Sequence, residues 1–178
     1  MKKIASCILG VVAIIVLIII DRITKNLAVI NLKDTTEYSV IDGIFSLHYL
    51  ENHGAAFGIL QNKQIIFYII TIIIVFVAAY IYFKLPSEKR YFGLRVIIVF
   101  IIAGALGNFI DRITQQYVVD FFYFKAINFP VFNVADIYVT GGAIAFIVLL
   151  IFYYKEDDFK RIFGEKKKRT TDYTNKGF

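Results

Sequence analysis

Four long apolar stretches constrain this chain more than any other feature of its sequence. Each is interrupted by only a few polar side chains. A helix that crosses a bilayer needs about 20 mostly apolar residues, and in hydrocarbon its backbone groups must be hydrogen-bonded internally. The stretches therefore predict membrane-spanning helices at about residues 4–28, 64–83, 96–114 and 134–154.

The composition agrees with a membrane protein of one domain. Of the 178 residues, 58% are hydrophobic and 19% are charged, against roughly 45–50% and 25% in soluble domains. This excludes a disordered chain and argues against a soluble globular one. One cysteine and two histidines do not suggest a disulfide framework or a zinc site, so we expect no metal and no cofactor. We assign residues 1–155 to the membrane domain and residues 156–178 to a charged, solvated tail.

Basic residues predict the orientation of the helices. Lys and Arg accumulate on the cytoplasmic side of membrane proteins. In this chain they are concentrated before the first predicted helix, between the second and third, and after the fourth, whereas the other two connections hold only Lys33, Lys63 and Lys125. We therefore expect both termini to be cytoplasmic and the other two connections to lie on the extracytoplasmic face.

The first outer connection contains a pattern typical of β-structure, over about residues 35–60. Residues 38–41 and 43–50 read as strands, because Phe45, Leu47 and Tyr49 alternate with polar residues. Asp42-Gly43 between them is a turn signal. The predicted fold class is an all-α membrane protein with four transmembrane helices and a small extracytoplasmic antiparallel β-sheet between helices 1 and 2.

The segment that follows these strands has two interpretations. It reads Glu51-Asn52-His53-Gly54-Ala55-Ala56-Phe57-Gly58 and is rich in small residues, which let another backbone approach closely. One interpretation is a tight turn that leads into the second helix. The other is a backbone surface that accepts an extended peptide, and the residues alone do not decide between them.

Charged residues lie at the outer ends of the predicted helices, where burial is costly and partners are needed. Asp21 and Lys25 are four positions apart on one helix, so they share a face and can pair. Asn108 and Arg112 have the same spacing on the third helix, with Asp111 beside them. These groups serve either to hold helices together or to build a site.

Asp120 and Asp136 differ from these acids. Asp120 has no neighbouring base, and Asp136 follows Asn133, a plausible N-cap at the start of the fourth helix. Asp136 is then either a capping carboxylate or, if the chain folds back, a partner of Asp120. Two close carboxylates in a low-dielectric site share a proton. Such a pair can activate a water molecule and protonate a leaving amine.

Five blocks that contain these residues, in this order, resemble the lipoprotein signal peptidases of bacteria, the type II signal peptidases. The resemblance covers about residues 14–152. The blocks are Asp21-Arg22-Ile23-Thr24-Lys25, Asn52-His53-Gly54-Ala55-Ala56-Phe57, residues 104–112, Val118-Val119-Asp120-Phe121 and Phe132-Asn133-Val134-Ala135-Asp136.

The resemblance implies an aspartic endopeptidase of the bacterial cell membrane whose active site faces the extracytoplasmic side. It would cleave the signal peptide of prolipoproteins immediately before a diacylglyceryl-modified cysteine. The resemblance places the catalytic pair at Asp120 and Asp136. It gives supporting or substrate-contacting roles to Asp21, Lys25, Asn52, Gly54, Asn108, Arg112 and Asn133. The expected partners are the lipid-modified prolipoprotein and membrane lipids, with no nucleic acid, and the expected state is a monomer.

Two other functions start from the same residues. Intramembrane carboxylates also carry protons, which suggests a small proton- or ion-coupled transporter, although no internal repeat is visible and the acids cluster toward one face. A non-catalytic membrane scaffold would explain Asp21 with Lys25. It leaves Asp120 without a partner.

Overall fold

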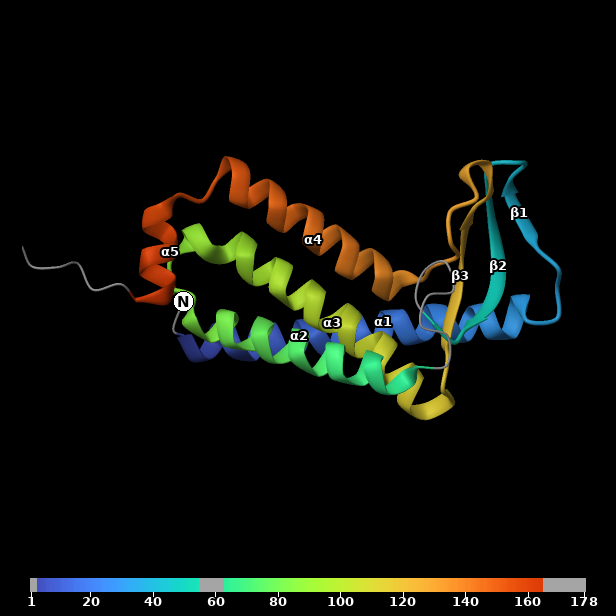
Figure 1. Cartoon of the computed structure of the whole chain (residues 1–178), viewed down its shortest axis with the longest axis horizontal. Helices are drawn as coiled ribbons and strands as arrows, with labels where there is room; N and C mark the ends of the chain where they lie inside the picture. Colours follow the sequence, from blue (N-terminus) through green and yellow to red (C-terminus); the bar gives the residue numbers. More distant parts are fainter. Residues whose placement is uncertain (1–2, 55–62, 165–178) are drawn as a thin grey trace, which may run out of the picture.

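A bundle of four long helices makes up most of the molecule (Figure 1). The computed structural model describes residues 3–54 and 63–164. Within this part of the chain, four helices are long and apolar enough to cross a membrane. They are α1 (Lys3–Leu32), α2 (Gln64–Lys84), α3 (Phe92–Gln115, preceded by a 3-10 turn at Lys89–Tyr91) and α4 (Val134–Phe152).

Helix α3 is the central helix of the bundle. Half of its most apolar window is buried, against 17% or less for the other three helices. Two glycines allow this close packing. A Cβ at Gly104 would overlap the carbonyl oxygen of Ala135 in α4, and a Cβ at Gly107 would lie 2.7 Å from Asp21 Oδ2 in α1. Small residues at helix crossings bring backbones together in membranes, so α1 and α4 both approach α3 in the half of α3 that contains Gly104 and Gly107.

A three-stranded antiparallel sheet stands across one end of the bundle (Figure 1). Its strands are β1 (Tyr38–Ile41), β2 (Phe45–Asn52) and β3 (Val118–Phe124), in the order β1-β2-β3. The first two strands and the turn between them confirm the prediction made from the sequence pattern. Gly43 in this turn has a positive φ of +70°, which favours glycine.

Strand β3 was not anticipated from the sequence. It comes from the connection between α3 and α4 and pairs with β2, so that Asn52 lies opposite Val118 and Leu50 opposite Asp120. Val119 and Phe121 of β3 pack against Ala28 and Leu32. This contact explains why α1 continues four residues beyond the predicted helix end.

A short helix, α5 (Glu156–Phe163), lies across the other end of the bundle (Figure 1). The expectation of a solvated tail is wrong for these residues, because Asp158 and Ile162 are only 5% exposed. Arg90 donates to both Asp158 oxygens, at 2.6 and 2.7 Å, and holds the pKa of that carboxyl well below its usual range. Residues 165–178 of the predicted tail, and residues 55–58 of the segment after the strands, lie outside the described residues.

The close approach at Gly104 predicts a cost for added volume. Gly104→Ala places a methyl group against the backbone of α4, so the helices must separate, and overpacking of this kind costs about 1–3 kcal/mol. We expect a lower thermal midpoint in detergent, measured by intrinsic fluorescence or scanning calorimetry. Gly141→Ala is the matched control, since nothing lies within 4 Å of its added Cβ. Equal midpoints for the two variants would contradict the packing argument.

Candidate active site

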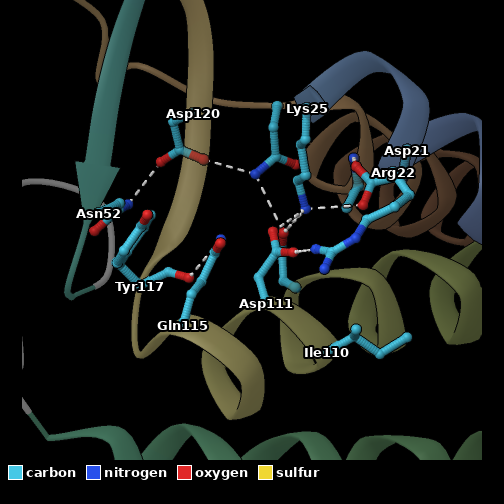
Figure 2. Close-up of polar contacts among 12 residues, drawn as sticks. Asp21, Arg22, Lys25, Asn52, Ile110, Asp111, Gln115, Tyr117 and Asp120 are labelled. Atoms are coloured by element: carbon cyan, nitrogen blue, oxygen red, sulfur yellow. Dashed lines mark hydrogen bonds and ion pairs between the residues drawn. The ribbon is translucent and has the colours of Figure 1, made fainter. Parts of the chain in front are cut away.

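A buried lysine organises the charged residues at the end of the bundle nearest the sheet (Figure 2). Lys25 is 1% exposed, and its Nζ lies 2.8 Å from Asp21 Oδ2 and 2.8 Å from Asp111 Oδ2. Arg22 also pairs with Asp111. The predicted pairing of Asp21 with Lys25 is confirmed. Two carboxylates and two cations balance one another here, as buried charges require.

The charged group around Lys25 is joined to the start of α4 at two points. Asp21 Oδ1 accepts a hydrogen bond of 3.0 Å from the backbone N–H of Ala135. Lys25 donates to Asn108 Oδ1 at 2.9 Å, and Asn108 Nδ2 donates to Asp136 Oδ1 at 2.8 Å. The position of Asp136 is therefore fixed through Asn108 by a group on α1.

Asn133 contacts both acids that the sequence singled out. As the N-cap of α4 it forms a reciprocal cap with Asp136: its Oδ1 accepts from the Asp136 N–H at 3.0 Å, and its own N–H donates to Asp136 Oδ2 at 3.1 Å. Its Nδ2 donates to Asp120 Oδ1 at 2.6 Å and to Asn108 Oδ1 at 3.1 Å. The capping interpretation of Asp136 is confirmed, and the same cap residue links Asp136 to Asp120.

Asp120 is held on the middle of β3 by two neutral amide donors. It is 2% exposed, and its second oxygen accepts from Asn52 Nδ2 at 2.7 Å (Figure 2). The pairing of β2 with β3 supplies this contact. Burial, followed by the nearby charge of Asp136, raises the pKa of Asp120 to about 7. The two amides and Lys25 oppose this rise, so Asp120 gains and loses a proton near neutral pH.

Both acids line a cavity of about 600 Å³ between α2, α3, α4 and the sheet. Four of the predicted supporting residues line it with them, namely Asn52, Gly54, Asn108 and Arg112. The other three, Asp21, Lys25 and Asn133, do not line the cavity. Lys25 and Asn133 contact residues that do, and Asp21 is connected to these through Lys25. The structure thus brings every predicted site residue into one connected network.

Arg112 connects the cavity wall to the segment after β2. Its guanidinium donates to the carbonyl oxygen of Gly54 at 3.0 Å and lies 4.3 Å from the centre of the Phe67 ring. None of the site residues predicted from the sequence lies in α2. Phe67, Thr71 and Ile74 all line the cavity, and their spacing of four and three residues along α2 is the signal that indicates a common face.

The chain matches one known protein family over most of its length. The sequence profile of signal peptidase (SPase) II matches residues 13–152. A lipoprotein signal peptidase of Clostridium novyi is 42% identical over 144 residues, which is 79% of this chain and 96% of the relative. One of Streptococcus pneumoniae is 43% identical over 150 residues, 83% of this chain and 95% of the relative.

Solved structures agree with the sequence comparisons. One described as a bacterial membrane enzyme has a TM-score of 0.72 and 35% identity, and the match covers 80% of this chain and 87% of that one. A second has a TM-score of 0.70 and 34% identity, over 82% of this chain and 94% of that one.

The fold and these matches define a multi-pass membrane hydrolase, an aspartic-type peptidase. The chain belongs to the signal peptidase II family, the lipoprotein signal peptidases, which process prolipoproteins at a bacterial cell membrane. This family membership replaces the transporter and scaffold alternatives. Asp120, for which the scaffold alternative offered no partner, accepts hydrogen bonds from Asn52 and Asn133.

The central place of Lys25 predicts that its loss destabilises the protein more than the loss of Arg22. Lys25→Met leaves Asp21 and Asp111 buried without their shared cation, and breaking a buried ion pair in this way costs about 3–5 kcal/mol. Arg22→Gln is the control, because the Arg22 side chain is 41% exposed and Lys25 still neutralises Asp111 in that variant. Thermal unfolding in detergent measures both. Similar midpoints for the two variants would count against a central role for Lys25.

Proposed function

We propose that Asp120 and Asp136 form the catalytic dyad that cleaves prolipoproteins immediately before a diacylglyceryl-modified cysteine. The observation that carries this proposal is the bridge through Asn133, which donates to both carboxyl groups at the wall of one cavity. Two acids held together in this way can exist with a single proton between them at neutral pH. This is the protonation state that acid–base hydrolysis of a peptide bond needs.

The proposed reaction uses one carboxylate as a base and one carboxylic acid as a donor. The ionised group removes a proton from a water molecule, which attacks the carbonyl carbon of the scissile peptide bond. The protonated group hydrogen-bonds the carbonyl oxygen, and a proton is then delivered to the leaving amine. The pKa of Asp120, at about 7, suits a group that exchanges a proton in each turnover.

The neighbouring residues have positioning roles in this proposal. Asn52 and Asn133 orient the Asp120 carboxyl, and Asn108 orients that of Asp136. Lys25 reaches Asp136 only through Asn108, so it fixes the site without forming a direct ion pair with either acid. Arg112 is bonded to the Gly54 carbonyl and so holds the chain just after β2 at the cavity wall, where an extended peptide would lie.

The cavity suits a substrate with a lipid on the residue after the cleavage site. Its walls combine the polar groups around the dyad with apolar side chains of the membrane-spanning helices, including Ile74, Ile101 and Ile137. A diacylglyceryl group keeps its cysteine at the bilayer surface, because each buried CH₂ contributes about 0.8 kcal/mol to membrane binding. A dyad at the outer ends of the helices is at the matching depth.

The proposed orientation places this dyad toward the extracytoplasmic face and both termini in the cytoplasm. The distribution of Lys and Arg supports it, since exposed Lys84 and Lys89 lie at the end of the bundle opposite the sheet. A monomer stays the expected state.

The dyad predicts that either acid is required for turnover. We expect Asp120→Asn and Asp136→Asn each to lower kcat by about 10²- to 10⁴-fold, since each removes one acid–base group. The measurement is cleavage of a diacylated prolipoprotein by purified enzyme in detergent or nanodiscs, with thermal midpoints to verify folding. Asp34→Asn is the control, because Asp34 is exposed beyond the end of α1. Near-normal cleavage by either dyad variant would remove that residue from the mechanism.

The substrate part of the proposal has its own control. The unlipidated form of the same precursor is assayed with the unchanged enzyme. We expect its cleavage rate to be lower by tenfold or more, because it loses contacts with the membrane and the cavity on the order of one to two kcal/mol. Equal rates for the two precursors would leave the dyad intact and remove the lipid requirement.

The raised pKa of Asp120 predicts the pH dependence of cleavage. The carboxyl is protonated below about 7 and ionised above it, so the shared proton is lost as the pH rises. We expect kcat/KM to fall on the alkaline side of about 7. Asn52→Ala removes a donor that favours the ionised form, and this variant is expected to move the falling limb to higher pH. A profile that is flat through this range, or a limb that moves to lower pH, would contradict the assignment.

A further inference from the structure

Helix α5 lies outside the part of the chain that the family profile matches, which ends at residue 152. It begins four residues after the last residue of α4 and runs across the end of the bundle, transverse to the membrane-spanning helices (Figure 1). A linker of three residues spans about 10 Å at most. The helix is therefore held at the membrane surface, parallel to it, at the end of the bundle opposite the sheet.

Two features fix how α5 is rotated about its own axis. Asp158 and Ile162, one turn apart, face the bundle, and Asp158 is bonded by Arg90 and by the Tyr91 hydroxyl at 3.1 Å. On one flank of the helix, Arg161 pairs with Glu88 of the connection that precedes α3 at 3.1 Å. The other flank carries the remaining aromatic residues of α5.

That second flank consists of Phe159 and Phe163, which are one turn apart and 37% and 54% exposed. At the end of α4, Ile151 and Phe152 are 67% and 82% exposed. Exposed Lys155 and Lys160 lie at the same end of the molecule, where Lys160 also pairs with Glu156 at 2.6 Å. Aromatic and basic side chains in this combination are typical of helices that lie in the headgroup region.

We propose that the Phe159–Phe163 flank of α5 binds the surface of the membrane, with its phenylalanines at the headgroup–acyl boundary and its basic residues on anionic headgroups. The bonds from Arg90 to Asp158 fix the rotation of α5 about its own axis, because turning the helix would break them. In the proposed orientation this surface is the cytoplasmic leaflet. The contact itself depends neither on that assignment nor on the catalytic dyad.

The chain contains no tryptophan, so a single introduced tryptophan reports on its own surroundings. The Phe163→Trp variant is compared with the Asp157→Trp variant, whose exposed position is on the flank of Arg161. Both variants are reconstituted in nanodiscs that contain phosphatidylcholine and phosphatidylglycerol. We expect the emission of the Phe163→Trp variant to be blue-shifted relative to that of the Asp157→Trp variant, quenched by lipids brominated near the headgroup, and protected from iodide.

The lipid preference is read with the Phe163→Trp variant. At equal mole fraction, brominated phosphatidylglycerol is expected to quench its emission about twofold more than brominated phosphatidylcholine, because basic residues concentrate anionic lipid. If iodide quenches the Phe163→Trp and Asp157→Trp variants equally, and neither brominated lipid quenches the former, the proposed contact is overturned. Equal quenching by the two brominated lipids would overturn the role of anionic headgroups. Cleavage activity, measured in parallel, reports separately on the proposed function.

Discussion

The pairing of the buried Lys25 ammonium group with Asp21 and Asp111 is the interaction on which the sheet end of this molecule depends. A charge in this position is tolerated only with full pairing, because desolvation costs several kcal/mol per ion. The pairing ties α1 to the central helix α3. Through Asn108 it also reaches Asp136, so the ion cluster and the proposed dyad form one structure.

In the part of the chain that the structure describes, neutral amides donate the hydrogen bonds that the two acids of the proposed dyad accept. Asn52, Asn108 and Asn133 donate to carboxyl oxygens and fix their positions without contributing a full charge. A cation in direct contact with Asp120 would favour the ionised form and lower its pKa. Lys25 instead holds Asn108, which in turn holds Asp136. Burial and the neighbouring acid can therefore keep the pKa of Asp120 near neutrality.

At each end of the bundle, a side-chain contact between residues far apart in the sequence joins two elements. At the end nearest the sheet, the bond from Asn52 to Asp120 joins β2 to β3. At the other end, the bond from Arg90 to Asp158 joins the 3-10 turn before α3 to α5. In both pairs the residues are 68 positions apart in the sequence. The lipid-facing helices between the two ends hold these contacts in place, since α3 packs against the other three.

The sequence by itself determined the four membrane helices, because hydrocarbon leaves an apolar segment no other stable backbone, and it determined the β1–β2 hairpin through alternation and the Asp42-Gly43 turn. It did not reveal β3, because residues 118–122 form an apolar run, broken only by the acid at 120, without the alternation of a half-buried strand. The motif blocks marked the residues of the site, and the local cap of Asn133 on Asp136 was readable from spacing. Only the tertiary structure decided that Asn133 also reaches Asp120, that Asn52 lies beside it, and that α5 folds back onto Arg90. Strand register and contacts between distant elements depend on packing that no local pattern encodes.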